Sequence, residues 1–224
     1  MGRVSEINVF LALLAAGLLG LGVPRTIDSV MQFQAAADQD LSNIDNLQNP
    51  AAQVAHAAQL ESVDDWFHDP DASIRAGTIQ FLMAVGQGNV DAARVETAIG
   101  DLETGLARAP ADPKAWMMLA LARNQLNDID GARLALRSSI LIAPYDPTLL
   151  LPRAGLGLKL VSALQADDWQ LVSEQIRMAA DHQFDGLVKL AEASDDPTPI
   201  MTALASDPDR AAALLAALGQ NQKK

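Results

Sequence analysis

The residues best suited to chemistry are a histidine and the aspartates that surround it. His68 lies beside Asp64, Asp65, Asp69 and Asp71. Imidazole nitrogens and carboxylate oxygens bind divalent cations, so this cluster has the composition of a weak metal site. Acidic side chains in this arrangement are also typical of a solvated helix end, where they accept hydrogen bonds from free backbone N–H groups. We favour the helix end and predict no bound metal.

Residues 127–131 have part of the spacing of a calcium loop. Their oxygen-bearing side chains are interrupted, because Leu126 offers no ligand and no Glu follows at the required distance. We therefore predict a turn between two helices. The glycine pairs within 86–88 and 155–157 lack the third glycine and the preceding strand of a dinucleotide-binding loop, and we interpret both as helix interruptions.

Other reactive groups are scarce. The 224 residues include no cysteine, which excludes disulfides, thiolate metal sites and thiol catalysis, and they include only three histidines. No serine has the setting of a nucleophile elbow. The formal charge of −12 argues against nucleic-acid binding, which depends on clustered Lys and Arg. The sequence predicts a protein that is not an enzyme and has no cofactor.

The composition favours helices as the elements that position these residues. Hydrophobic residues make up 50% of the chain but aromatic residues only 4%, and 40 Ala and 32 Leu supply most of the apolar content. Ala and Leu have high helix propensities, whereas strands favour the β-branched and aromatic residues that are rare here. We expect an all-α fold.

The N-terminal region has the pattern of a membrane anchor. Residues 7–23 carry no charge and are followed by Pro24 and Arg25. A helix of this length reaches about 25 Å, slightly less than the hydrocarbon core of roughly 30 Å. We predict an anchor over 1–24 in a bacterial inner membrane, with a cytoplasmic N-terminus and a periplasmic C-terminal domain. A cleaved signal peptide and a buried helix are the alternatives.

The chain beyond the anchor divides into three helical parts. Diluted apolar positions predict a helical stalk over 25–70, and stronger helical patterns predict repeats over 71–182. Residues 183–224 are expected to form a C-terminal helical cap with a polar outer face. Within this plan, a helix should end near Val85, and another should begin at Asp207-Pro208-Asp209.

Side chains of similar size recur every 34 residues. The clearest unit, 113–146, contains Pro113, Trp116, Leu119, Ala120, Ala132, Leu136, Ser139 and Pro144. A shift back by 34 gives Leu82, Gly86, Ala98, Leu102, Gly105 and Pro110, and a shift forward gives Pro147, Leu150, Ala154, Ala166 and Ser173. Small residues recur where paired helices touch, and Pro recurs where the second helix ends. In the third unit, Pro152 and the glycines of 155–157 should disturb the first helix, and the second helix should begin late.

This unit resembles the tetratricopeptide repeat (TPR), whose pattern has a Trp, a Leu-Gly pair, an Ala in the second helix and a terminal Pro. The resemblance covers about 75–180 and implies an array of helical hairpins with a protein-binding groove. The inward positions of its first helix correspond here to Lys114, Met117, Leu121, Asn124 and Gln125. Met117 and Leu121 favour an apolar or helical ligand over an acidic tail. Alternatively, these two side chains pack against a neighbouring helix.

The charges are unevenly placed. Residues 161–224 carry 5 basic and 10 acidic side chains, whereas the middle of the chain is relatively basic. The basic residues there are Arg123, Arg133, Arg137, Arg153 and Lys159. They form either a docking patch for an acidic partner or the counter-charges of local carboxylates, and we favour the second interpretation.

Two functions are compatible with these features. The first is a membrane-tethered TPR scaffold that mediates protein–protein interactions in a bacterial envelope complex for assembly or secretion, with residues 7–23 in the bilayer. The second is a structural accessory subunit whose N-terminal helix packs within a larger membrane complex. We favour the scaffold.

Overall fold

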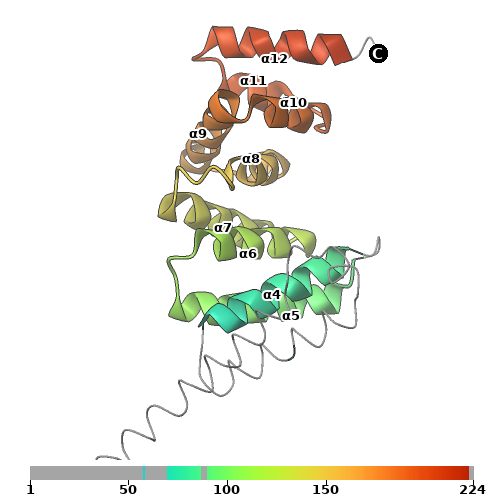
Figure 1. The fold of residues 1–224 in the computed structure, drawn as a ribbon, viewed down its shortest axis with the longest axis vertical. Coiled ribbons are helices and arrows are strands. Elements are labelled where there is room, and N and C mark those ends of the chain that lie inside the picture. The colour runs from blue at the N-terminus through green and yellow to red at the C-terminus, as the bar shows by residue number, and fades with distance from the viewer. Residues whose placement is uncertain (1–57, 59–69, 87–89, 222–224) are drawn as a thin grey trace, which may run out of the picture.

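The computed structural model describes residues 58, 70–86 and 90–221, and every regular element in this part of the chain is helical. The all-α prediction is therefore confirmed for these residues. The elements are α4 (Pro70–Val85), α5 (Ala92–Arg108), α6 (Pro113–Gln125), α7 (Ile129–Ile142), α8 (Leu150–Lys159), the 3₁₀ helix η1 (Val161–Ala163), α9 (Ala166–His182), α10 (Phe184–Glu192), α11 (Thr198–Ala203) and α12 (Pro208–Asn221). They stack along one long axis (Figure 1).

Helices α4 to α9 form three antiparallel hairpins. A Cβ added at Gly105, near the end of α5, would lie 2.8 Å from the Pro70 carbonyl oxygen at the start of α4. The Ser139 hydroxyl of α7 donates to the Pro113 carbonyl at the start of α6 (2.7 Å). Arg153 near the start of α8 hydrogen-bonds Gln175 in the second half of α9 (3.3 Å). Each hairpin also contacts the next one through α5–α6 and α7–α8.

Aspartate side chains define where three helices begin. Asp91 accepts from the Arg94 backbone N–H (3.2 Å), Asp112 from that of Lys114 (2.8 Å), and Asp128 from that of Gly131 (3.0 Å). Each contact satisfies a backbone donor that has no partner within the helix, which typically contributes about 1 kcal/mol. Asp128 belongs to the stretch with calcium-like spacing; a turn between two helices is confirmed there, but it covers 126–128, since α7 already begins at Ile129.

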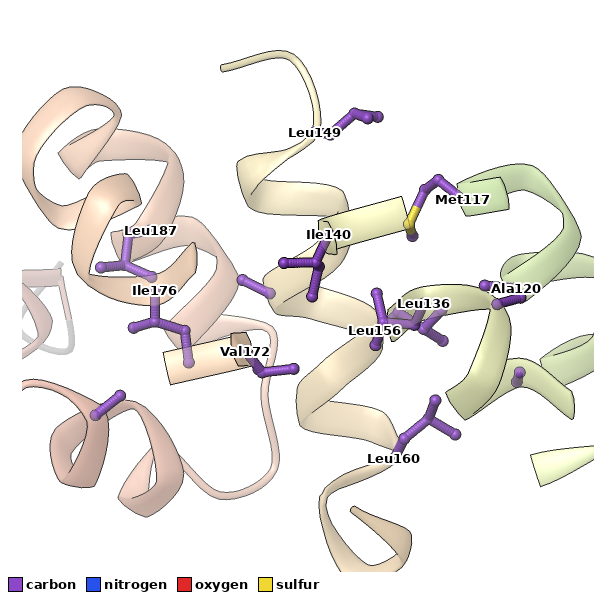
Figure 2. Packing of buried hydrophobic residues seen from close by; sticks show 14 of the residues in the cluster. Met117, Ala120, Leu136, Ile140, Leu149, Leu156, Leu160, Val172, Ile176 and Leu187 are labelled. Atoms are coloured by element: carbon purple, nitrogen blue, oxygen red, sulfur yellow. The ribbon is translucent and has the colours of Figure 1, made fainter. Parts of the chain in front are cut away.

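An apolar core extends from α4 to α12, and a second, smaller cluster joins α4, α5 and α6. The fully buried members of the larger core include Leu102, Leu136, Ile176, Leu187 and Leu204, so every hairpin and the C-terminal helices contribute. Figure 2 shows part of this core, in which side chains of α6, α7, α8 and α9 interdigitate. Burying a side chain of this size contributes about 1.5–3 kcal/mol relative to leaving it in water.

The buried positions of α5 and α7 repeat at the predicted interval. Ala98, Leu102, Gly105 and Leu106 of α5 are buried, and so are the residues 34 positions later, Ala132, Leu136, Ser139 and Ile140. In α9 the corresponding buried set lies 40 positions after that of α7, at Val172, Ile176, Ala179 and Ala180. The late start of this helix is therefore confirmed. The residues equivalent to Ala132 and Ser139 are Val172 and Ala179 rather than Ala166 and Ser173.

The first helix of each hairpin (α4, α6 and α8) follows the predicted 34-residue interval less well than the second helix does. Helix α4 ends at Val85, as the glycines after it indicated, so Gly86 lies outside the helix although Ala120 lies within α6. The expected disturbance of α8 is wrong, because this helix is continuous through Pro152 and Gly157. Pro152 is in the first turn, where its missing N–H is tolerated. Gly157 allows close packing, since a Cβ there would lie 2.4 Å from the Cγ1 atom of Val172.

The last helix of the predicted C-terminal cap, α12, exposes both apolar and polar residues. Helix α12 buries Leu214 and contacts α10. Its exposed residues include Ala212, Ala213, Leu215 and Ala216 as well as Asp209, and a polar outer face of the cap stays a prediction. Besides Leu214, the partly buried Ala211, Ala217 and Leu218 of α12 pack against the apolar core.

The predicted anchor over 1–24 lies outside the described residues, as does nearly all of the predicted stalk over 25–70. Among the residues that the structure describes, no helix is both long enough and apolar enough to cross a bilayer.

Candidate protein-binding surface

The five residues of the predicted groove differ in exposure. Lys114 and Gln125 are exposed at opposite ends of α6, and Leu121 and Asn124 are half-buried. Met117 is only 3% exposed and belongs to the apolar core (Figure 2). Met117 thus packs between helices, as the alternative interpretation had it. Ligand binding by the other four remains a prediction.

The basic residues of the central section are mostly engaged within the chain. Arg123 contacts Glu103 of α5 (2.5 Å) and Asp128 (3.8 Å). Arg133 and Arg137 of α7 each approach a different oxygen of Asp168 of α9 at 2.6 Å. Lys159 is exposed. These contacts support the interpretation that the arginines balance local carboxylates.

Asp168 is the acidic centre of this ion-pair cluster. Burial raises the pKa of its carboxyl, but the hydrogen bonds and charges of Arg137 and Arg133 lower it by more, so the net shift is below the ordinary value. The side chain is nearly inaccessible. Asp168 is therefore ionised near neutral pH and links α7 to α9, and it is not available to a ligand.

Arg153 has no accessible surface. Its Nε donates to the Ser139 hydroxyl oxygen (3.1 Å), and its Nη atoms donate to the carbonyl oxygens of Ser139 (2.6 Å) and Ala143 (2.8 Å). These carbonyls belong to the last turn and C-cap of α7, where a positive charge interacts favourably with the helix dipole. Burial lowers the pKa of the Arg153 guanidinium, and the charge of Asp146 opposes this shift. Arg153 is thus structural and unavailable for docking.

An exposed apolar stripe follows one face of α7. Leu134 is 51% exposed and Leu141 is 56% exposed, and the half-buried Ser138 lies between them at helical spacing. Tyr145, just beyond the helix, is 76% exposed. We call these three large residues, Leu134, Leu141 and Tyr145, the α7 stripe.

The corresponding positions of the other second helices are small or acidic. The residues 34 positions before Leu134 and Leu141 are Gly100 and Ala107 of α5. Those 40 positions after are Glu174 and Asp181 of α9. All four are exposed. Among these three helices, only α7 presents large apolar side chains at these positions. Sequence reasoning missed the stripe because heptad-spaced leucines are also expected in a core.

A cleft of about 400 Å³ lies where the third hairpin meets α11. It is lined by Val161, Leu164, Ala166, Trp169, Asp196, Thr198, Pro199 and Thr202. None of the five predicted groove residues lines it. The sequence provided no signal for this cleft, because its lining comes from both sides of the predicted boundary between repeats and cap.

No group of three or more His, Cys, Asp or Glu side chains in the described part of the chain is arranged to hold a metal ion. The His68 cluster lies mostly outside these residues, and Asp71 alone is described.

Comparisons with family models, with curated proteins and with solved structures yield no match. What the protein does must therefore be inferred from its own residues.

Proposed function

We propose that this protein is a membrane-tethered scaffold with TPR-like repeats, which brings together other proteins of a bacterial envelope complex. In this proposal, residues 7–23 span the inner membrane and the helical array lies in the periplasm. The proposal assigns the chain no catalytic residue, no cofactor and no nucleic-acid partner.

The recurrence of buried positions supports a repeat architecture. Four buried residues of α5 correspond to four buried residues of α7 at an interval of 34, the length of a TPR unit. The helices are paired in antiparallel hairpins, and each hairpin contacts the next. In such arrays most of each repeat's outer surface remains free, which is why they commonly bind other proteins.

The observation that carries the proposal is the α7 stripe. Solvent-exposed apolar patches with polar surroundings mark protein interaction sites more often than scattered apolar residues do. The matched positions Gly100, Ala107, Glu174 and Asp181 show that the hairpin architecture itself does not require large apolar residues there. The stripe therefore has no structural role in pairing α6 with α7, and partner binding accounts for its composition.

The test is site-specific crosslinking in native membranes. A photoreactive amino acid at Ser138, between the two leucines, should crosslink a partner protein that mass spectrometry identifies. The variant Leu134→Glu/Leu141→Glu should lose this product, because burying two carboxylates in an interface costs more than the contact provides. The matched control is Gly100→Glu/Ala107→Glu, which introduces the same charges at the corresponding positions of α5 and should retain it.

Other outcomes decide between the alternatives. A crosslink that persists in the Leu134→Glu/Leu141→Glu variant contradicts binding through the stripe. If Lys114→Glu/Gln125→Glu abolishes the crosslink instead, the predicted groove on α6 is the binding surface. A detergent-stable complex that is lost on deleting residues 1–30, yet is insensitive to all of these substitutions, supports the accessory subunit.

A further inference from the structure

The cleft between the third hairpin and α11 is a second surface that the α7 stripe does not include. Its walls come from three segments: η1 with the loop after it, the first turn of α9, and α11 with Asp196 just before it. Helix α11 packs on α9 near this point (Figure 1). The volume of about 400 Å³ is within the range of sites that hold ligands, roughly 300–1,000 Å³.

The cleft is lined by large apolar side chains that are not fully covered. Trp169, Leu164 and Pro199 are half-buried, and Val161 is exposed. Trp169 and Leu164 also pack against the core, so they are held in place from behind. A partly exposed Trp on a rigid support is typical of the anchor points of protein interfaces.

The surroundings of the cleft are acidic. Asp196 lines it, and Asp167 and Asp195 are exposed neighbours in the chain. Hydrogen bonds from the Thr198 hydroxyl and backbone N–H hold the pKa of the Asp196 carboxyl below its usual range, so this group is ionised near neutral pH. Arg177 contacts Glu174 and also donates to the Ala203 carbonyl of α11, Arg210 contacts Asp181, and the exposed Lys159 lies two positions before Val161.

We propose that this cleft binds a short segment of a partner protein in which large apolar side chains stand next to Lys or Arg. The apolar side chains would cover Trp169, Leu164 and Val161, and the basic groups would face Asp196 and its acidic neighbours. The inference goes beyond the proposed function, since it concerns different elements and names the chemistry of the bound segment. It holds or fails independently of binding at the α7 stripe.

The experiment measures binding of labelled synthetic peptides to the full-length protein by fluorescence anisotropy. The probe is a short peptide of Leu and Lys, compared with one in which Glu replaces Lys and one in which Ser replaces Leu. Only the Leu–Lys peptide should bind, and its affinity should fall as salt rises from about 50 to 500 mM because the charges become screened.

Two variants locate the binding site. Thr202→Trp places a large ring in the cleft at an exposed position without changing any charge, and it should weaken binding at least about tenfold by removing apolar contact. Asp196→Asn keeps an oxygen that can accept from the Thr198 N–H but removes the charge, and it should weaken binding by roughly two- to fivefold.

The matched control is Asp209→Asn, which removes one exposed charge from α12 and should leave the affinity unchanged. Circular dichroism confirms that each variant keeps its helices. If Thr202→Trp binds the Leu–Lys peptide as tightly as the unmodified protein does, or if the Glu or Ser peptides bind equally well, the proposal is wrong. These results do not depend on crosslinking at Ser138, so the two proposals can fail separately.

Discussion

Leu119 and Arg153 occupy the same place in two successive hairpins, 34 residues apart, and both are buried. Leu119 of α6 belongs to the apolar core together with Leu102 and Leu106 of α5. Arg153 of α8 instead hydrogen-bonds the end of α7 and Gln175 of α9. The first junction between hairpins is thus apolar at this position, and the second is polar.

The difference shows two ways to join helical hairpins. An apolar junction is stabilised in proportion to the area that it removes from water, which sets few conditions on the angle or offset of the helices. A buried arginine must have hydrogen-bond partners at defined positions, because unsatisfied polar groups in the interior are costly. The polar junction therefore specifies how α8 and α9 sit against α7. The change in the spacing of the second helices from 34 to 40 arises beyond this junction, because the six extra residues lie after Arg153 and before Val172, within the third hairpin.

Removing the arginine should have the largest effect on stability. We expect Arg153→Ala to lower the free energy of unfolding by about 3–5 kcal/mol, because it leaves a cavity and deprives the carbonyls of Ser139 and Ala143 of their donor. Urea unfolding monitored by circular dichroism measures this change.

Two further variants sharpen the same comparison. Arg153→Leu copies the side chain of the first junction and refills much of the volume, so its loss should be smaller, about 1–3 kcal/mol from unsatisfied carbonyls. Arg123→Ala removes a partly exposed arginine and should cost about 1 kcal/mol or less. Equal losses for Arg153→Ala and Arg123→Ala would show that the buried network does not hold the second junction.

The ion-pair cluster at the second junction should make stability depend on pH. The pKa of Asp168 is lowered in the folded state, so its contribution is fully present above its unfolded pKa of about 3.9 and is lost as the pH falls below that value. We expect Asp168→Asn to lower the free energy of unfolding by about 2 kcal/mol at pH 7 and to reduce the fall in stability between about pH 5 and 2.

The control for this prediction is its neighbour Asp167, which is exposed. Asp167→Asn should change stability by less than about 0.5 kcal/mol and should keep the acid dependence of the unmodified protein. If the stability of the Asp168→Asn variant still falls steeply at low pH, other carboxylates are responsible for the acid dependence.

Two Gly→Ala substitutions should have the smallest effects on the free energy of unfolding, and these effects should have opposite signs. Gly157 packs against Val172 where α8 meets α9, whereas no atom lies within 4 Å of a Cβ added at Gly100 on the outer face of α5. Gly157→Ala should destabilise by about 1–2 kcal/mol through overpacking, and Gly100→Ala should stabilise by about 0.5–1 kcal/mol through helix propensity. Thermal unfolding of both variants shows directly whether each substitution raises or lowers the stability. A stabilising Gly157→Ala would mean that the third hairpin is looser than the structure indicates.

The prediction from sequence was most accurate where local signals and packing agree. The end of α4, the turn between α6 and α7, and the start of α12 are marked by Gly, Asn, Asp or Pro residues whose backbone preferences act over a few positions. The interval between α5 and α7 was predictable because both helices bury small and large residues in the same order. These features depend on neighbours in the chain and need no knowledge of the tertiary fold.

The candidate binding surfaces were much less predictable. Met117 was expected to line a groove and lies in the core, whereas Leu141 of α7 is exposed. Both are apolar residues at helical spacing, and the side of a helix that faces water depends on which helices pack around it. The cleft joins residues 161–169 to residues 196–202, and no periodic pattern links those two segments.

The sequence by itself determined that the described chain is helical, where several of its helices begin and end, and that small and large side chains recur at 34 residues. Only the tertiary structure decided that Arg153 and Asp168 are buried, that α8 continues through its glycines, and that the buried positions of α9 are offset by six further residues. Helix formation is controlled by propensities and capping within about one turn of the chain. Burial and ion pairing depend on contacts between residues that are 10 to 35 positions apart.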